Sequence, residues 1–238
     1  MANIFLSSIG KKLVMSISGL FLMVFLVLHL CINLSAVVSQ SAYNAACEFM
    51  DTNIFIRIMV PVLTLGVVVH IIFATIITLR NRKARPVKYA VGTGTKASTW
   101  ASRNMFVLGL IVLGFLAIHL VHFWAKMQLQ HFTGGVPAKD PYLLVKSTLE
   151  NPINAAIYLA WFAALWFHLC HGFWSAFQSS GLNNSRWLSR LQVAAKAFAT
   201  LVVAGLSVVV LYFALGLAPK AAAGGASHGV EPKVTLVQ

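Results

Sequence analysis

The chain has 238 residues, of which 59% are hydrophobic and only 10% are charged, and its mean hydropathy is +0.81. A soluble domain carries roughly 25% charged residues, so this composition excludes an ordinary soluble protein and predicts a membrane protein. The net charge of +13 would suit a nucleic-acid partner, but the positions of the basic residues, given below, argue against one.

Five apolar segments follow one another along the chain, and each exceeds the ~20 residues needed to cross hydrocarbon. We predict an all-α membrane protein whose five transmembrane helices form one domain over residues 1–218. The helices are expected at about 13–36, 55–79, 104–126, 153–178 and 194–217. Pro61 and Pro152 are expected in or just before the first turn of the second and fourth helices, where proline is tolerated.

The segments between these helices are polar. Residues 80–103 and 127–151 contain glycine and proline and are predicted to be loops. The small, polar segment 219–238 is expected to be a flexible tail. The first apolar segment is longer than the 7–15-residue core of a signal peptide, so we expect it to be a retained helix.

The charges predict an orientation. With the N-terminus in the cytoplasm, most of the lysines and arginines and none of the acids fall on the inner side. This positive-inside pattern puts the C-terminus outside and makes anionic headgroups or a docked subunit the expected neighbours, rather than nucleic acid. The inner residues are Lys11, Lys12, Arg80, Arg82, Lys83, Arg85, Lys88, Lys96, Arg103, Arg186, Arg190 and Lys196.

Each of the first four apolar segments contains a histidine at a position inside the bilayer. These are His29, His70, His119 and His168. An imidazole in a bilayer is costly and needs a partner, and four of them on four helices can form two pairs. Two facing neutral imidazoles are the axial ligands that a b-type haem iron takes.

Two of these histidines lie at matching depth near the outer face. His29 is 17 residues beyond Lys12, or ~25 Å along a helix, and His119 is 16 residues beyond Arg103, or ~24 Å. The first and third helices run in the same direction. We therefore expect His29 and His119 to form an outer pair.

The other two lie at matching depth nearer the inner face. His70 is ten residues before Arg80, and His168 is ten residues before Gln178, which is ~15 Å in each case. They are expected to form an inner pair, ~10 Å from the outer pair along the membrane normal. Two haems at these levels would make a path for electrons across the membrane.

Alternatives remain open from the residues alone. Any of these histidines can be a hydrogen-bonded packing residue, and the chain can then be a haemless transporter or scaffold. His122 and His171 each lie three residues after a proposed ligand and can replace it, contact a haem edge, a propionate or a quinone, or simply be polar residues near the interface. A non-haem metal enzyme or transporter would need histidines or carboxylates gathered at one depth.

The histidine segments resemble a known family. The chain carries LVLHLCIN at His29, YNAACEFMD in the first outer loop, VVVHIIFA at His70, FLAIHLVHFW at His119 and WFHLCHGFWSAF at His168. In this order and spacing, over residues 8–217, it resembles the dihaem cytochrome b subunit of succinate:quinone oxidoreductases, in the single-subunit, five-helix, menaquinone-linked branch. The resemblance implies two b haems, with His29 and His119 as ligands of the outer haem and His70 and His168 as ligands of the inner haem.

The resemblance also implies a complex in a bacterial cytoplasmic membrane. A flavoprotein subunit would interconvert succinate and fumarate, and an iron–sulfur subunit would pass electrons to this anchor, which itself does no dicarboxylate chemistry. The basic loop 80–103 would be the docking surface, and the whole complex can be dimeric. The physiological direction stays open.

Menaquinone would react near the outer haem, by the same resemblance. Glu48 and Asp51 are the nearest ionisable groups by topology, or else ordinary solvated charges, and Arg57 would meet a haem propionate or snorkel to the outer interface. Some relatives carry a glutamate for proton transfer two residues before the fourth ligand, where this chain has Trp166. We therefore expect electron transfer without that proton path.

Overall fold

The structure is a computed structural model that describes residues 7–84, 99–136, 138–177 and 185–219. This part of the chain is helical and contains no strand. Five of its helices are long and apolar enough to cross a membrane, which confirms the predicted all-α architecture with five such helices. The tail beyond Pro219, with His228, and the middle of the loop 80–103 lie outside the described residues.

Four of the long helices are continuous and the third span is divided. The continuous helices are α1 (Ser8–Val38), α3 (Ile54–Lys83), α9 (Pro152–Ala176) and α10 (Ser185–Ala214). The third span consists of α5 (Met105–His119), the π-helix η2 (Leu120–Trp124) and α6 (Ala125–Met127). The π-helix therefore begins directly after one of the proposed ligands, and such insertions are frequent at functional sites.

Short helices occupy much of the sequence between the spans. They are α2 (Gln40–Thr52), α4 (Trp100–Arg103), α7 (Leu129–Thr133) and α8 (Pro141–Leu149). The prediction that 127–151 is a loop was therefore wrong for α7 and α8, and the prediction that 80–103 is a loop was wrong for α4 and for the end of α3. The segment YNAACEFMD, expected in the first outer loop, lies in α2. The start of α8 has a clear local cause, since the Asp140 side chain accepts a hydrogen bond from the Leu143 N–H and Pro141 stands at the first helical position.

Two predicted features of the long helices differ in the structure. Pro61 lies inside α3 rather than in its first turn, because the Asn53 side chain caps the helix by accepting from the Phe55 and Ile56 N–H groups. The last helix starts at Ser185 instead of 194, so its first turns are polar and include Arg186 and Arg190.

The last helix also ends earlier than predicted, at Ala214 instead of 217. Gly216 adopts a left-handed conformation with φ 67°, and its N–H bonds to the Phe213 carbonyl while the Leu217 N–H bonds to the Tyr212 carbonyl. A left-handed glycine after the last turn is a common helix terminator, because it turns the chain away while satisfying the final carbonyls.

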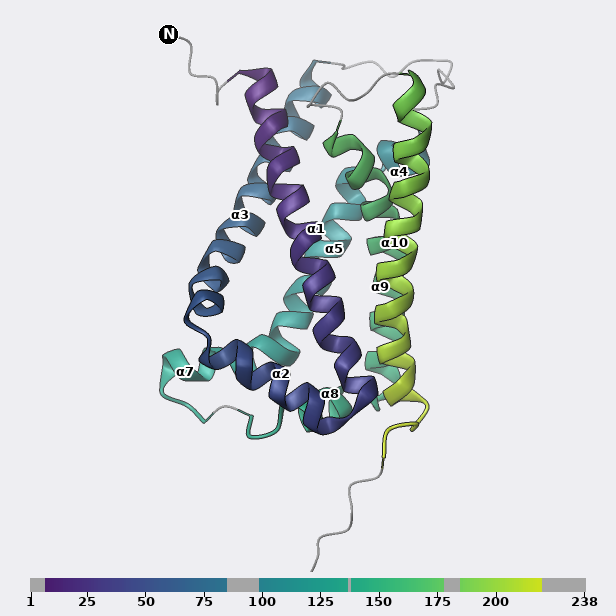
Figure 1. The fold of residues 1–238 in the computed structure, drawn as a ribbon. Coiled ribbons are helices and arrows are strands. Elements are labelled where there is room, and N and C mark those ends of the chain that lie inside the picture. The colour runs from purple at the N-terminus through teal and green to yellow at the C-terminus, as the bar shows by residue number, and fades with distance from the viewer. Residues whose placement is uncertain (1–6, 85–98, 137, 178–184, 220–238) are drawn as a thin grey trace, which may run out of the picture.

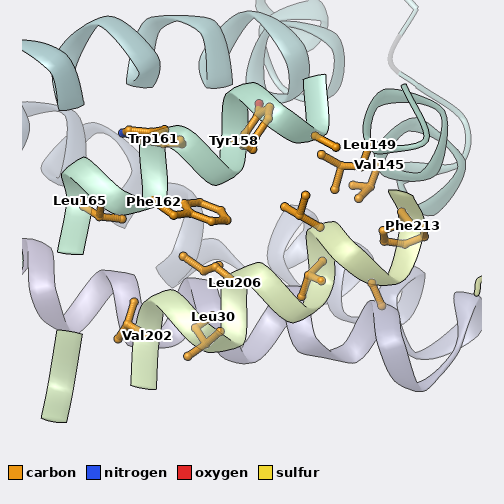
Figure 2. Packing of buried hydrophobic residues seen from close by; sticks show 14 of the residues in the cluster. Leu30, Val145, Leu149, Tyr158, Trp161, Phe162, Leu165, Val202, Leu206 and Phe213 are labelled. Atoms are coloured by element: carbon orange, nitrogen blue, oxygen red, sulfur yellow. The ribbon is translucent and has the colours of Figure 1, made fainter. Parts of the chain in front are cut away.

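The core lies between α9, α10 and α1, with α8 closing one end. Figure 2 shows this cluster, in which Phe162 and Leu206 pack between the facing helices and Phe213 lies toward α8. α9 also packs against α5, whereas α3 packs mainly against α1. No residue described in α3 is buried, so this helix lies at the edge of the bundle and exposes apolar side chains, as expected for a surface facing lipid.

The described ends of the chain lie at opposite ends of the bundle, and the charges differ between these ends (Figure 1). The end where α1 starts carries basic residues and, among the described residues, no acid. We call it the basic end: Lys11, Lys12, Arg80, Arg82, Lys83, Arg103, Arg186, Arg190 and Lys196.

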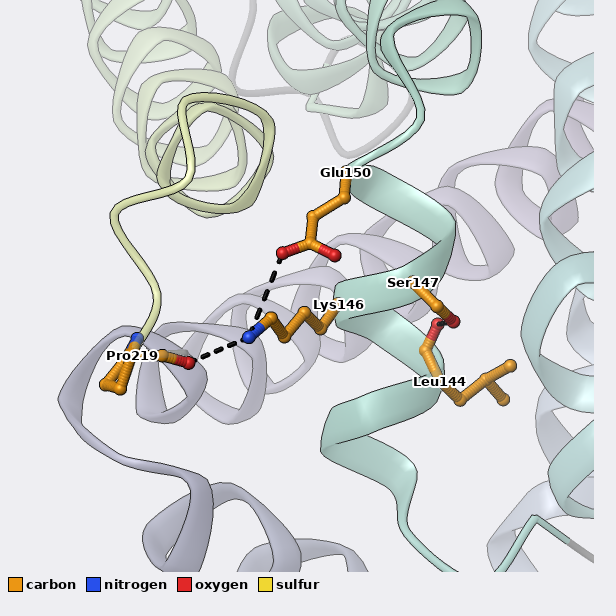
Figure 3. A network of polar contacts seen from close by, with 5 residues as sticks. All are labelled: Leu144, Lys146, Ser147, Glu150 and Pro219. Atoms are coloured by element: carbon orange, nitrogen blue, oxygen red, sulfur yellow. Dashed lines mark hydrogen bonds and ion pairs between the residues drawn. The ribbon is translucent and has the colours of Figure 1, made fainter. Parts of the chain in front are cut away.

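We call the opposite end the α2 end, because α2 lies across it (Figure 1). It carries Glu48, Asp51, Asp140 and Glu150 together with four basic residues. Lys146 ties α8 to the end of α10: its Nζ donates to the Pro219 carbonyl at 2.7 Å and lies 3.8 Å from a Glu150 oxygen (Figure 3).

Asp140 joins α8 to α2 at this end. Gln40 donates to one carboxylate oxygen at 2.6 Å and Asn44 donates to the other at 2.9 Å, while the Asn44 side-chain oxygen accepts from the Tyr142 N–H. Partial burial alone would raise the pKa of Asp140. The hydrogen bonds from Asn44, the Leu143 N–H and Gln40 outweigh it and hold the pKa below its ordinary value.

Candidate paired-histidine sites

The four proposed ligands lie in two close pairs. The ring centroids of His29 on α1 and His119 on α5 are 5.6 Å apart, with the ring planes at 81°. Those of His70 on α3 and His168 on α9 are 6.4 Å apart, with the planes at 63°. The structure thus brings together the same pairs that were expected from their depth.

The two pairs lie at different levels of the bundle. Two glycines show this, because they lie beside the rings of His70 and His168 but on the helices that carry His29 and His119. A Cβ on Gly19 of α1 would lie 3.4 Å from His70 Cε1, and a Cβ on Gly109 of α5 would lie 3.6 Å from His168 Cε1. Each glycine is ten residues before the outer ligand on its own helix, which is ~15 Å.

The ~10 Å between the pairs expected from the sequence came from counting residues from the ends of the apolar runs. That estimate assumed that Arg80 and Gln178 mark the same membrane plane as the other helix ends. In the structure α3 continues to Lys83 and α9 ends at Ala176, so the ends of the apolar runs do not mark one plane.

Both ring separations fit two imidazoles that ligate one metal from opposite sides. Histidine nitrogens bound at ~2.0 Å on either side of a metal place the ring centroids roughly 6 Å apart. Among the described residues there is no group of three or more His, Cys, Asp or Glu side chains that could hold a metal ion. A metal held by two histidines needs its other ligands from elsewhere, and the haem macrocycle supplies four.

Buried polar atoms without partners lie beside the pairs. In the described part of the chain, the Nδ1 atoms of His119, His168 and His171 and the indole Nε1 of Trp161 are buried and form no hydrogen bond. The Trp161 ring centroid is 5.9 Å from that of His119. Unsatisfied polar groups are rare in protein interiors, so these atoms mark the surroundings of the two pairs as unusual within an apolar bundle.

Ser18 contacts one of the ligands, a contact that the sequence analysis missed. Its Oγ lies 3.3 Å from His70 Nδ1, and its side chain is buried on α1 next to Gly19. The available signal was the Ser18-Gly19 pair, eleven and ten residues before His29, whose counterpart on α5 is Leu108-Gly109.

His122 contacts a neighbouring helix through its side chain. It lies in η2, and its Nδ1 is 3.2 Å from the Tyr158 hydroxyl on α9. It also lines an open groove on the bundle surface with Ala117, Ile118 and Val121. Tyr158 was likewise missed by the sequence analysis, because nothing in its local sequence marks it as a partner of His122.

His171 follows His168 by one turn on α9. Its ring packs edge-on against Trp174, with centroids 4.9 Å apart and planes at 87°. Trp166, on the same helix, donates its indole N–H to the Thr200 hydroxyl of α10 at 3.0 Å, so the position that carries a glutamate in some members of the resembled family here joins two helices.

The three remaining candidates lie at the α2 end. Glu48 and Arg57 have exposed side chains on α2 and α3. Asp51 is half-buried and accepts a hydrogen bond from Gln128 at 3.2 Å, which ties α2 to the segment after α6. A structural role is therefore visible for Asp51.

No family model matches the chain, and neither the curated proteins nor the solved structures that were compared with it contain a match.

Proposed function

We propose that this chain is the membrane-anchor cytochrome b subunit of a succinate dehydrogenase or fumarate reductase complex. It would bind two b haems, the outer through His29 and His119 and the inner through His70 and His168. One observation carries the proposal: two histidine pairs bridge different helices at separate levels, with ring separations of 5.6 and 6.4 Å that suit axial ligation.

The protein's part in this function is binding, spacing and exclusion of water. The four imidazoles would hold the two haem irons, and Gly19 and Gly109 lie beside the rings of the inner pair. The apolar helices keep water and mobile charge away, which lowers the local dielectric constant. When bound, each haem supplies one-electron chemistry, because its iron alternates between the ferrous and ferric states.

The charge distribution supports the proposed partners and orientation. Nine lysines and arginines and no acid lie among the described residues of the basic end. We infer that this end faces the bacterial cytoplasm, according to the positive-inside rule, and receives the iron–sulfur and flavoprotein subunits. The central residues of the proposed docking loop 80–103 lie outside the described part of the chain.

The proposed second substrate is menaquinone, reacting near the outer haem. His122 supports this position. It is three residues after His119, it lines a surface groove, and its Nδ1 lies 3.2 Å from the Tyr158 hydroxyl. An imidazole and a phenol in contact can donate and accept the protons that quinone reduction requires. Glu48 and Asp51 lie at the same end of the bundle and are the candidate carboxylates.

The test is the haem content of the purified complex. A pyridine haemochrome assay with a reduced-minus-oxidised visible spectrum is expected to give two b haems per chain. One haem would mean that one histidine pair is structural. Folded protein that binds no haem when haem is supplied would overturn the proposal and favour a transporter or scaffold.

A further inference from the structure

The Ser18 side-chain hydroxyl meets one of the four proposed ligands, His70, and it does so from a neighbouring helix. The serine belongs to α1, whereas His70 belongs to α3. Its side chain is buried, with 7% of its surface exposed, so water does not compete freely for the contact.

The hydroxyl has a second contact, which favours one direction for the first. Ser18 Oγ donates to the Met15 carbonyl at 3.0 Å, and a carbonyl can only accept. With its one hydrogen given to Met15, the Ser18 oxygen is free to accept from a proton on His70 Nδ1, which lies 3.3 Å away. A neutral imidazole protonated at Nδ1 carries its free lone pair on Nε2, the atom available for a metal.

The neighbouring residue, Gly19, also lies against the His70 ring. A Cβ on Gly19 would lie 3.4 Å from His70 Cε1, in van der Waals contact with the ring. Ser18 therefore contacts His70 Nδ1 through its hydroxyl, and Gly19, with no side chain, lies beside the adjacent ring atom, Cε1.

The other proposed ligand of the inner site, His168, also lies beside a glycine, but its Nδ1 has no hydrogen-bond partner in the described residues. Gly109 of α5 lies beside His168 in the same way, yet the preceding residue is the buried Leu108. His168 Nδ1 is among the buried atoms without a partner in the described residues. The two ligands of the inner site are thus unequal.

We propose that Ser18 is a positioning residue for the inner haem, and that it fixes the tautomer and rotation of His70. This inference rests on the proposed function. A partner that accepts the second N–H of a metal-bound imidazole raises the basicity of the ligand. A more basic ligand stabilises ferric over ferrous iron and lowers the midpoint potential of the inner haem.

The test is a potentiometric titration of Ser18→Ala, Ser18→Thr and a control variant. Ser18→Ala is expected to raise the midpoint potential of the inner haem, with a tenfold change in the ferrous-to-ferric ratio corresponding to ~59 mV for one electron. Haem retention at the inner site is expected to fall by about tenfold or more. Ser18→Thr keeps the hydroxyl and should restore both values.

Ser35→Ala is the matched control. Ser35 is on the same helix and its hydroxyl also donates to the carbonyl three residues earlier, that of Ile32. It should leave the inner potential unchanged. The inner haem is identified beforehand as the one lost in His70→Ala.

The outcomes separate this inference from the proposed function. Wild-type protein without haem would overturn the proposed function. Two haems in the wild type, with an inner potential in Ser18→Ala equal to that of the wild type, would overturn the role of Ser18 alone. An equal shift in Ser18→Ala and Ser35→Ala, or no rescue by Ser18→Thr, would also overturn it, because a general loss of packing would then explain the change.

Discussion

At the residue scale, each proposed ligand meets its partner across helices that are not close neighbours. α1 packs mainly against α2, α3, α9 and α10, yet His29 meets His119 of α5. His70 of α3 likewise meets His168 of α9, although α3 packs mainly against α1. The side chains, rather than direct helix packing, therefore bring the members of each pair together.

Two glycines of the bundle give a matched test of the space beside these rings. Gly19→Val should push the His70 ring from its position, at about 1–3 kcal/mol, the usual cost of overpacking, and reduce the inner haem content. Gly114→Val is the control, because a Cβ at Gly114 would meet nothing within 4 Å. Haem per chain and thermal stability are measured for both. Equal haem loss in the two variants would contradict a specific role of Gly19.

The histidine pairing could be predicted from the sequence because an intramembrane histidine is rare and its depth follows from the helix in which it lies. The contacts of Ser18 and Tyr158 could not be predicted. Serine and tyrosine are ordinary residues, and whether they reach His70 or His122 depends on how each helix is rotated about its axis, which hydropathy does not report.

At the element scale, the five long helices could be predicted from their apolar length. The short helices α2 and α8 could not, because their sequences are mixed in polarity and their stability comes from capping and tertiary contacts. Asp140 shows this most clearly, since it caps α8 and also binds Gln40 and Asn44 of α2.

Asp140 therefore carries a stability prediction. Asp140→Ala removes the cap of α8 and should lower the free energy of unfolding by about 1 kcal/mol, the usual cost of losing an N-cap. Thermal unfolding in detergent measures the effect. A variant as stable as the wild type would contradict the role of Asp140 in joining α8 to α2.

The same carboxylate predicts a dependence on pH. Its pKa in the folded protein lies below the ordinary value, so its stabilising effect is complete above that ordinary value, ~3.9, and is lost as the pH falls further, through the folded pKa. The difference in stability between the wild type and Asp140→Asn should therefore be constant near neutral pH and shrink below about pH 4. A difference that grows on acidification would contradict this.

At the scale of the whole molecule, charge and topology agree. The up-and-down path of five helices puts the start of α1 and the end of α10 at opposite ends of the bundle (Figure 1). The basic end carries the start of α1 and the α2 end carries the acids of the described residues. The prediction that the basic end is cytoplasmic rests only on the excess of lysine and arginine at that end.

Cysteine labelling tests this orientation. In a chain whose native cysteines are replaced, Ala45→Cys on α2 and Ser189→Cys on α10 put single thiols at exposed positions at the α2 and basic ends. A maleimide that does not cross membranes should label Ala45→Cys in intact cells and Ser189→Cys only after lysis. The reverse pattern would contradict the orientation proposed for the bundle.

The central claim is that four histidines hold two haems in the pairs observed. Its most direct test is a potentiometric visible titration of the four single His→Ala variants of the purified complex. We predict that His29→Ala and His119→Ala remove or alter the same haem, and that His70→Ala and His168→Ala affect the other. Variants of one pair that affect different haems, or four variants that all leave the haem spectra unchanged, would contradict the account.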